Sequence, residues 1–152
     1  MTVKEIKNTL YEECKSVVEN RYQKIKQNIA DIEESLEEES KSSAGDKHET
    51  GRAMLQIDRE NAGKQLLEIE KVKQLLPKID VNSTSDYARL GSLVYTDNAT
   101  YFLGISIGDV AVNKTHYLCV SLNSPVGSLL SGKKKGDTFS FNERAFKVTS
   151  IK

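Results

Sequence analysis

The chain has 152 residues, enough for one ordinary domain or two small units. Its 22 basic and 22 acidic side chains balance, so net charge provides no general attraction to nucleic acid or to a membrane surface. The two ends differ, because residues 1–50 hold 8 basic and 12 acidic side chains, whereas residues 81–152 hold 8 basic and 5 acidic ones. This asymmetry favours docking in one direction on a partner with the opposite charge pattern.

The two cysteines, Cys14 and Cys119, lie far apart, and neither belongs to a CxxC pair. Both fall in apolar patterns, which predicts two buried thiols rather than a zinc or redox site. No apolar run approaches the roughly 20 residues that a membrane-spanning helix needs. The N-terminal residues also lack the apolar core of a signal peptide. We therefore expect a cytoplasmic protein with no membrane partner.

A long helix is predicted from Val3 to about Ser40, a segment without Gly or Pro. Its other faces are rich in Lys, Glu, Asn and Gln, as a solvated helix surface requires. The apolar residues follow a heptad seam, which upstream positions continue at helical spacing. The seam comprises Val18, Tyr22, Ile25, Ile29, Ile32 and Leu36, and the upstream positions are Val3, Ile6, Leu10 and Cys14.

A second helix is predicted from Asp46 to about Leu76, after the turn composition of residues 41–45 and before the helix-breaking Pro77. Two amphipathic helices joined by a short turn bury their apolar stripes best against each other. We therefore predict that residues 1–78 form a long antiparallel α-helical coiled-coil hairpin. The apolar positions of the second helix include Met54, Ile57, Ala62, Leu66, Ile69, Val72 and Leu76.

The predicted hairpin turn is followed by a pair of carboxylates, Asp46 and Glu49. One interpretation is structural, since Asp at a helix N-cap with Glu three residues later is a common capping pattern. The other is a metal site at a protruding tip, because residues three apart share one side of a helix. Two carboxylates alone bind Mg²⁺ weakly, so such a site would need further oxygens from a partner.

The second half is predicted to be a small antiparallel β-rich domain, residues 89–152, after a linker at residues 79–88. Turn signals separate five segments of alternating polarity. Between the third and fourth segments, Ser124 fits a helix N-cap, Pro125 the first helical turn and Gly132 the residue after the helix. The predicted strands are 90–96, 100–107, 116–122, 138–141 and 145–151.

The chain contains no GxSxG, no P-loop and no GxGxxG motif, and its serines and histidines show no spacing typical of a catalytic triad. The sequence alone therefore indicates no enzyme of these classes. The lysines at 133–135 fit the end of the short helix and solvent, or contact with phosphate or an acidic partner.

The sequence resembles the Gre transcript cleavage factors (GreA/GreB type) of bacterial RNA polymerase. The run Ser124-Pro125-Val126-Gly127, Leu130, Gly132-Lys133-Lys134 and Gly136-Asp137 matches the family's S-P-[IV]-G…L…G-K-x-x-G-D pattern. Gly91-Ser92-Leu93-Val94 resembles its G-[AS]-x-V strand, and Gly45-Asp46-Lys47-His48-Glu49 has the G-D-x-x-E spacing of its tip. In this sequence Thr50-Gly51-Arg52-Ala53 follows Glu49, where the family has E-N-A-E-Y.

The resemblance implies an α+β protein with a coiled-coil hairpin and an FKBP-like C-terminal domain. It implies that the protein acts as a monomer that binds RNA polymerase, enters its secondary channel with the hairpin tip and approaches the nascent RNA 3′ end. Asp46 and Glu49 would be the catalytic carboxylates, sharing Mg²⁺ with the polymerase, with no cofactor of the protein's own. Ser124, Pro125, Gly127 and Lys133 would contribute to polymerase docking.

Besides a coiled-coil adaptor that dimerises through the first helix, two alternatives remain open at this point. In one, the protein occupies the polymerase channel and regulates transcription without stimulating cleavage, with the tip carboxylates serving as a helix cap. In the other, which belongs to a different class, the FKBP-like domain acts as a peptidyl-prolyl isomerase or chaperone, although fold by itself does not carry that activity.

Overall fold

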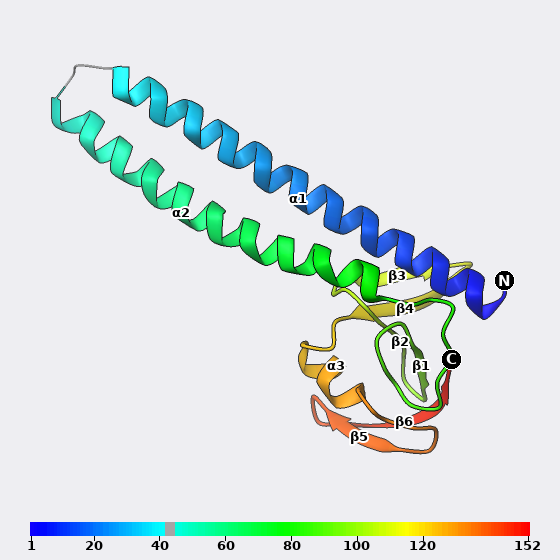
Figure 1. Cartoon of the computed structure of the whole chain (residues 1–152). Coiled ribbons are helices and arrows are strands. Elements are labelled where there is room, and N and C mark those ends of the chain that lie inside the picture. The colour runs from blue at the N-terminus through cyan, green and yellow to red at the C-terminus, as the bar shows by residue number, and fades with distance from the viewer. Residues whose placement is uncertain (42–44) are drawn as a thin grey trace. The chain divides into compact units, whose positions relative to one another are not determined.

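The structure, a computed structural model, describes residues 1–41 and 45–152, with the backbone alone at residues 45–48. Two helices, α1 (Val3–Lys41) and α2 (Gly45–Leu75), precede a short 3₁₀ turn η1 (Leu76–Lys78) and a strand-rich region. Figure 1 shows this order of elements along the chain. The predicted α+β class, with long N-terminal helices and a small β-rich C-terminal part, is confirmed at this level.

The molecule divides into two compact units. The sheet unit comprises residues 1–17 and 74–152, and the helix-pair unit comprises residues 18–73. The first four turns of α1 therefore belong with the strands, and residues 79–88 lie inside the sheet unit. The predicted division into a hairpin at residues 1–78, a linker at 79–88 and a C-terminal domain at 89–152 stays a prediction.

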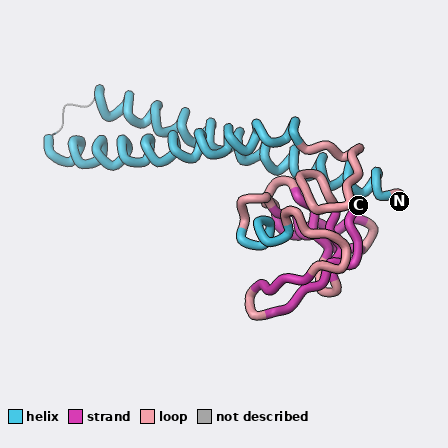
Figure 2. The backbone as a smooth tube through the Cα atoms, turned by 60° about the horizontal axis from the view of Figure 1, so that its bottom comes forward, coloured by secondary structure: helices cyan, strands magenta, loops and turns pink. Residues whose placement is uncertain are grey.

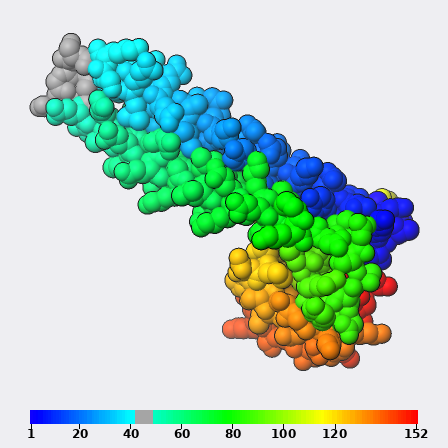
Figure 3. Space-filling model, viewed as in Figure 1, coloured from blue at the N-terminus to red at the C-terminus, as the bar shows by residue number. Residues whose placement is uncertain are grey.

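In the helix-pair unit, α1 and α2 pack side by side and run in opposite directions. Arg59 Nε lies 3.1 Å from Glu33 Oε1, and Lys73 Nζ lies 3.5 Å from Glu19 Oε2. The later residue of α2 thus contacts the earlier residue of α1, as antiparallel helices require. A thin apolar cluster of Ile29, Ile32 and Ala62 joins the helices, with Ile25, Leu36, Leu55 and Leu66 packed around it. The space-filling view shows the side chains of the two helices meeting along this pair (Figure 3).

The predicted apolar positions of α2 divide into two groups. Ala62 and Ile69 are buried, whereas the side chains of Met54 and Ile57 are 63% and 57% exposed. At 100° per residue, the midline of positions 54 and 57 lies about 100° around the helix from the midline of positions 62 and 69, which places the first pair at the side of a narrow seam. The prediction that Met54 and Ile57 belong to the buried stripe is wrong, and Leu55 occupies the seam instead.

The sheet unit contains six strands in the order β3-β4-β2-β1-β6-β5. Their bounds are β1 Leu93–Thr96, β2 Thr100–Leu103, β3 Gly108–Val112, β4 Thr115–Val120, β5 Thr138–Phe141 and β6 Arg144–Ile151. Short helix α3 (Pro125–Leu130) lies between β4 and β5 in the chain. Figure 2 shows these strands gathered in one body that includes α3.

The expectation of an entirely antiparallel sheet is wrong at one pair. Strand β2 runs parallel to β4, whereas the other four pairs are antiparallel. The cause is β3, which the sequence pattern did not predict because Gly108 and Asp109 are poor strand formers and read as a turn. The chain reverses into β3 and again at Asn113-Lys114, where both residues have positive φ, so β4 regains the direction of β2.

One apolar cluster of the sheet unit lies between the sheet and α3. Val126 and Leu130 of α3 pack with Val94, Leu103 and Val148, all of them buried. On the β5–β6 pair, the rings of Phe139 and Phe146 stack with centroids 5.0 Å apart. Alternation along each strand places these apolar side chains on one face, as the period of two in the sequence predicts.

The first turns of α1 are part of this unit through buried side chains and specific polar contacts. Leu10 and Cys14 are fully buried, and Lys7 Nζ donates to the carbonyl oxygens of Ser83 (3.2 Å) and Lys152 (3.3 Å). The apolar positions upstream of Val18 thus serve the sheet unit rather than extending the seam between the helices. The predicted strand and helix boundaries near Pro125 and Asn142 are confirmed within a few residues.

Candidate functional site

The first turns of α2 contain the two carboxylates singled out in the sequence. Helix α2 begins at Gly45, so Asp46 is already a helical residue and does not precede the helix as an N-cap would. Asp46 and Glu49 are one turn apart on the same helix, which places their Cα atoms on one side of it. The side chain of Asp46 lies outside the described residues, whereas that of Glu49 is exposed.

An acidic first turn has two chemical uses. The partial positive charge of a helix N-terminus stabilises nearby carboxylates, and ionised carboxylates supply the oxygen ligands that Mg²⁺ prefers. Among the residues whose side chains are described, no group of three or more His, Cys, Asp or Glu side chains is arranged to hold a metal ion. An exposed Glu49 therefore suits a site that other ligands complete.

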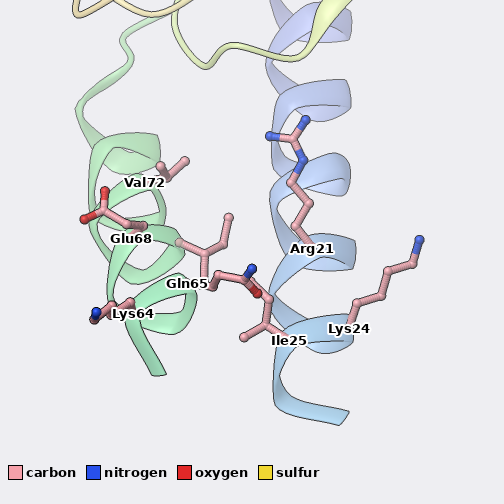
Figure 4. A pocket seen from close by; sticks show the side chains of 8 residues that line it. Arg21, Lys24, Ile25, Lys64, Gln65, Glu68 and Val72 are labelled. Atoms are coloured by element: carbon pink, nitrogen blue, oxygen red, sulfur yellow. The ribbon is translucent and has the colours of Figure 1, made fainter. Parts of the chain in front are cut away.

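A groove of about 510 Å³ lies between α1 and α2 in the helix-pair unit. Figure 4 shows Ile25 of α1 and Gln65 of α2 directed toward one another across it, with Lys24 and Lys64 projecting to its outer sides. Sequence reasoning missed this groove, although the irregular apolar spacing of α2 was a signal that the seam is incomplete. The lining residues are Arg21, Lys24, Ile25, Lys64, Gln65, Glu68, Ile69 and Val72.

Close to the groove, the ring of Tyr22 is covered by a cation. Lys73 Nζ lies 3.7 Å from the Tyr22 ring centroid and also pairs with Glu19 at 3.5 Å. Hydrogen bonding from Gln23 and the charge of Lys73 lower the pKa of the exposed Glu19 carboxyl. These contacts join α1 to α2 where apolar burial is thin, so we assign them a structural role.

The residues of the C-terminal run build the loop that begins α3. Ser124 Oγ accepts a hydrogen bond from Gly127 N (3.0 Å) and donates one to Ser121 O (2.7 Å), which confirms Ser124 as the N-cap. A Cβ on residue 127 would lie 1.8 Å from Ser121 O, so only Gly fits there. Pro125 occupies the first helical turn, as predicted.

The last residues of the C-terminal run, from Lys133 to Asp137, also make structural hydrogen bonds. The backbone of Lys133 accepts a hydrogen bond from Ala88 N (2.7 Å), and the Asp137 carboxylate accepts one from Lys134 N (2.8 Å). The motif therefore has a local structural explanation at Ser124, Gly127 and Asp137. A docking role for Ser124, Pro125, Gly127 and Lys133 stays a prediction, with exposed Pro125 and half-buried Lys133 the more accessible of the four.

The two thiols meet inside the sheet unit. Cys14 of α1 and Cys119 of β4 are both free and buried, as the sequence predicts. A hydrogen bond from Cys119, with a second from the backbone of Ile105, lowers the pKa of Cys14, and the same thiol contact together with burial raises the pKa of Cys119. The pair fastens the first turns of α1 to the sheet.

Two further observations bear on function. His116 Nδ1 lies 3.0 Å from both carboxylate oxygens of Asp109, but both side chains are exposed, so the pair resembles an ordinary surface ion pair. Within the described part of the chain, no helix combines the length and the apolar character needed to cross a bilayer.

Comparison with protein-family models gives no match, and comparison with curated protein sequences gives none either. The resemblance to the Gre family therefore rests on the motifs of the sequence itself.

Proposed function

We propose that the protein binds bacterial RNA polymerase and stimulates cleavage of backtracked RNA, as the Gre resemblance implies. The observation that carries the proposal is an exposed carboxylate, Glu49, in the first turns of α2, one helical turn after Asp46. The antiparallel packing of α1 and α2 supports a hairpin whose turn lies next to these residues. The C-terminal run from Ser124 to Asp137 supplies the second, independent part of the resemblance.

In this proposal, the two carboxylates contribute oxygen ligands to a Mg²⁺ ion. Asp46 and Glu49 would hold Mg²⁺ together with carboxylates of the polymerase, and that ion would supply Lewis-acid activation of water. Two carboxylates in water repel by only about 0.7 kcal/mol at a separation of roughly 6 Å, so repulsion is a small obstacle to such a pair. Their role is to deliver negative charge and oxygen ligands to an active site that lies on the partner.

The finer features of the fold belong to the same proposal. Residues 1–78 would act as a coiled-coil hairpin, and residues 89–152 would be an FKBP-like domain that docks on the polymerase. The six-stranded sheet packed against α3 supports such a domain. An FKBP-like fold carries no prolyl isomerase activity by itself, and no specific contact among the described residues favours that activity.

The decisive experiment adds the purified protein to stalled, backtracked polymerase complexes with labelled RNA and measures shortening of the transcript. We expect cleavage to be stimulated, and we expect Asp46→Asn combined with Glu49→Gln to abolish the stimulation while polymerase binding persists. Glu34→Gln is the matched control, because it removes an exposed carboxylate of α1 away from the pair. A double variant that cleaves as well as the wild type would refute the role of the carboxylates.

A second candidate function, polymerase binding without cleavage, is favoured by the position of Asp46. Because α2 begins at Gly45, Asp46 and Glu49 both fall where negative charge stabilises a helix start, which accounts for them without chemistry. The sequence after Glu49 also departs from the family tip. Polymerase binding without RNA shortening across a wide range of Mg²⁺ concentrations would select this function.

A further inference from the structure

Two nucleophilic side chains meet inside the sheet unit, and the proposed function uses neither of them. Cys14 of α1 has no exposed surface, and Cys119 of β4 is 1% exposed. Both thiols are free. They lie far apart in the chain but belong to the same compact unit, so their contact is a feature of one body.

Alternation along β4 shows which face of the sheet holds Cys119. Its neighbours Leu118 and Val120 pack in the apolar cluster that includes α3. Successive side chains of a strand point to opposite faces, so Cys119 lies on the other face. There it continues a row across three strands, because Cys119 pairs with Phe102 and Phe102 pairs with Leu93. Phe102 and Leu93 are fully buried, so this second face is also covered.

The thiol of Cys14 meets Cys119 on this second face, and the contact is directional. The Cys119 thiol donates a hydrogen bond to the Cys14 sulfur, which also accepts one from the backbone N–H of Ile105. Donors that point at a sulfur favour its thiolate, and the thiolate is the nucleophilic form of cysteine. The pair therefore holds one sulfur ready to attack and a second sulfur beside it.

The edge strand β3 leaves an approach to this pair. Gly108 pairs with Cys119, and directly opposed residues of an antiparallel pair share one face of the sheet. A Cβ on Gly108 would meet nothing within 4 Å, so the space beside Cys119 at this edge is open. Local opening of the first turns of α1 then suffices to admit a molecule as small as a hydroperoxide, because helix ends open at low cost in free energy.

We propose that Cys14 and Cys119 form an intramolecular disulfide when the protein meets a hydroperoxide, and that this bond locks the first turns of α1 to the sheet. The Cys14 thiolate attacks a peroxide oxygen, the O–O bond breaks, and Cys14 becomes a sulfenic acid while water is released. The Cys119 sulfur then attacks the Cys14 sulfur and displaces hydroxide, which takes the Cys119 proton and leaves as water. The two thiols lose two electrons to the peroxide, so one hydrogen peroxide gives one disulfide and two waters.

A purely structural role for the two thiols predicts a different behaviour. Thiols buried separately in apolar surroundings are inert, which is the outcome that the sequence predicts because nothing in it shows that the two residues meet. An S–S bond of about 2.05 Å is shorter than a hydrogen-bonded contact between two sulfurs, so α1 and β4 must approach slightly as it forms. The bond would close a loop on the order of 100 residues and restrict the unfolded chain accordingly.

The first test treats the reduced full chain with hydrogen peroxide and maps its peptides without reduction. We expect one pair of peptides joined through Cys14 and Cys119 and released by dithiothreitol. Met54 is 63% exposed, so its conversion to the sulfoxide in the same digest shows that the peroxide was active. Free thiols at both positions after Met54 is oxidised, sulfinic acid without a disulfide, or a disulfide that joins two copies would each overturn the proposal.

Single variants test the order of the two steps. In Cys119→Ala the sulfenic acid of Cys14 has no thiol to attack it, so dimedone should trap it. In Cys14→Ala we expect about tenfold less dimedone adduct at Cys119, because burial keeps that thiol protonated. Equal trapping at both positions would overturn the assignment of Cys14 as the attacking sulfur. The peptide map of the wild type needs no variant and decides whether the disulfide forms.

The locking of α1 is measured by urea unfolding of the reduced and the oxidised chain. Closure of a loop on the order of 100 residues should raise the urea midpoint by roughly 1–3 M. Cys14→Ala, treated with peroxide in the same way, is the control and should show no increase. An oxidised wild type whose midpoint is unchanged or lower would overturn the locking role. None of these measurements involves RNA polymerase, so their outcome is independent of the proposed function.

Discussion

The sheet unit and the helix-pair unit are stabilised in different ways. In the sheet unit, side chains such as Phe102, Leu103 and Leu130 have no exposed surface, and one apolar cluster, which includes Leu103 and Leu130, lies between the sheet and α3. In the helix-pair unit, the buried cluster consists of Ile29, Ile32 and Ala62, and exposed ion pairs flank it. Two helices enclose only one row of side chains, so little apolar area is removed from water per residue.

Substitutions in the core should destabilise the sheet unit more than the helix-pair unit. A tightly enclosed core cannot relax around a change in volume, whereas a thin seam can close up or admit water. The proposed functional carboxylates lie in the unit with the thinner core, where the surface is most tolerant of change. The residues that resemble the Gre C-terminal run lie in the unit with the denser core, where several have structural roles.

The largest effect should come from Gly127→Ala in the sheet unit. Its Cβ would lie 1.8 Å from Ser121 O, a backbone atom that cannot move without breaking the start of α3. We expect a loss of more than about 4 kcal/mol in the free energy of unfolding, or failure to fold. Gly108→Ala is the control, because nothing lies within 4 Å and only its positive φ is strained, at a cost of about 1–2 kcal/mol. Urea denaturation measures both, and similar losses would contradict the packing argument.

The next effect compares one buried residue from each unit on the same helix. Leu10→Ala removes a fully buried side chain from the sheet unit and should cost about 3–4 kcal/mol. Ile32→Ala removes a side chain from the thin seam and should cost about 2 kcal/mol, the low end for such a truncation, because the seam can relax. Equilibrium unfolding by circular dichroism tests this. An equal loss of unfolding free energy for both variants would contradict the difference in packing between the units.

A smaller effect separates capping from surface hydrogen bonding at α3. Ser124→Ala should cost about 1 kcal/mol, because the Ser124 hydroxyl accepts from Gly127 N and caps the helix. Ser128→Ala should cost less than about 0.5 kcal/mol, since its exposed hydroxyl donates to Pro125 O in a surface hydrogen bond. The difference in urea midpoint measures the contribution of the cap. Equal midpoints would show that the Ser124 contact adds nothing beyond a surface hydrogen bond.

The smallest effect is a pH dependence at Lys7. Burial lowers the pKa of Lys7 below 10.5, so between the folded value and 10.5 the unfolded chain binds more protons than the folded one. Stability attributable to this group therefore rises as pH increases through that window. The difference in unfolding free energy between wild type and Lys7→Met should accordingly grow in favour of wild type as pH is raised toward 10.5. A difference that stays constant with pH would show that Lys7 does not titrate differently on folding.

Local rules were sufficient for much of the fold. The absence of Gly and Pro between Val3 and Ser40 predicts one uninterrupted helix, and Ser124 with Pro125 predicts the start of α3, because caps and helix breakers act through neighbouring backbone atoms. Local rules failed at β3, where Gly108 and Asp109 suggest a turn and pairing with β4 overrides their low strand propensity.

The candidate sites also differ in how far the sequence predicts them. Sequence spacing alone places Asp46 and Glu49 one turn apart on a helix, and whether they act in catalysis stays a prediction. The irregular apolar spacing of α2 indicates an incomplete seam, but the place of the groove between α1 and α2 depends on which side of α2 faces α1. That choice leaves Met54 and Ile57 in solvent and places Leu55 in the seam.

Sequence patterns were enough to predict the two long helices, the turn residues of the β-rich half and the burial of both cysteines, because period, caps and composition act over short distances. The packing of the first turns of α1 with the strands, through Leu10 and the contact of Cys14 with Cys119, became evident from the fold alone. An apolar stripe predicts that this side of a helix is buried. It does not predict which element covers the stripe, because the hydrophobic effect has no direction.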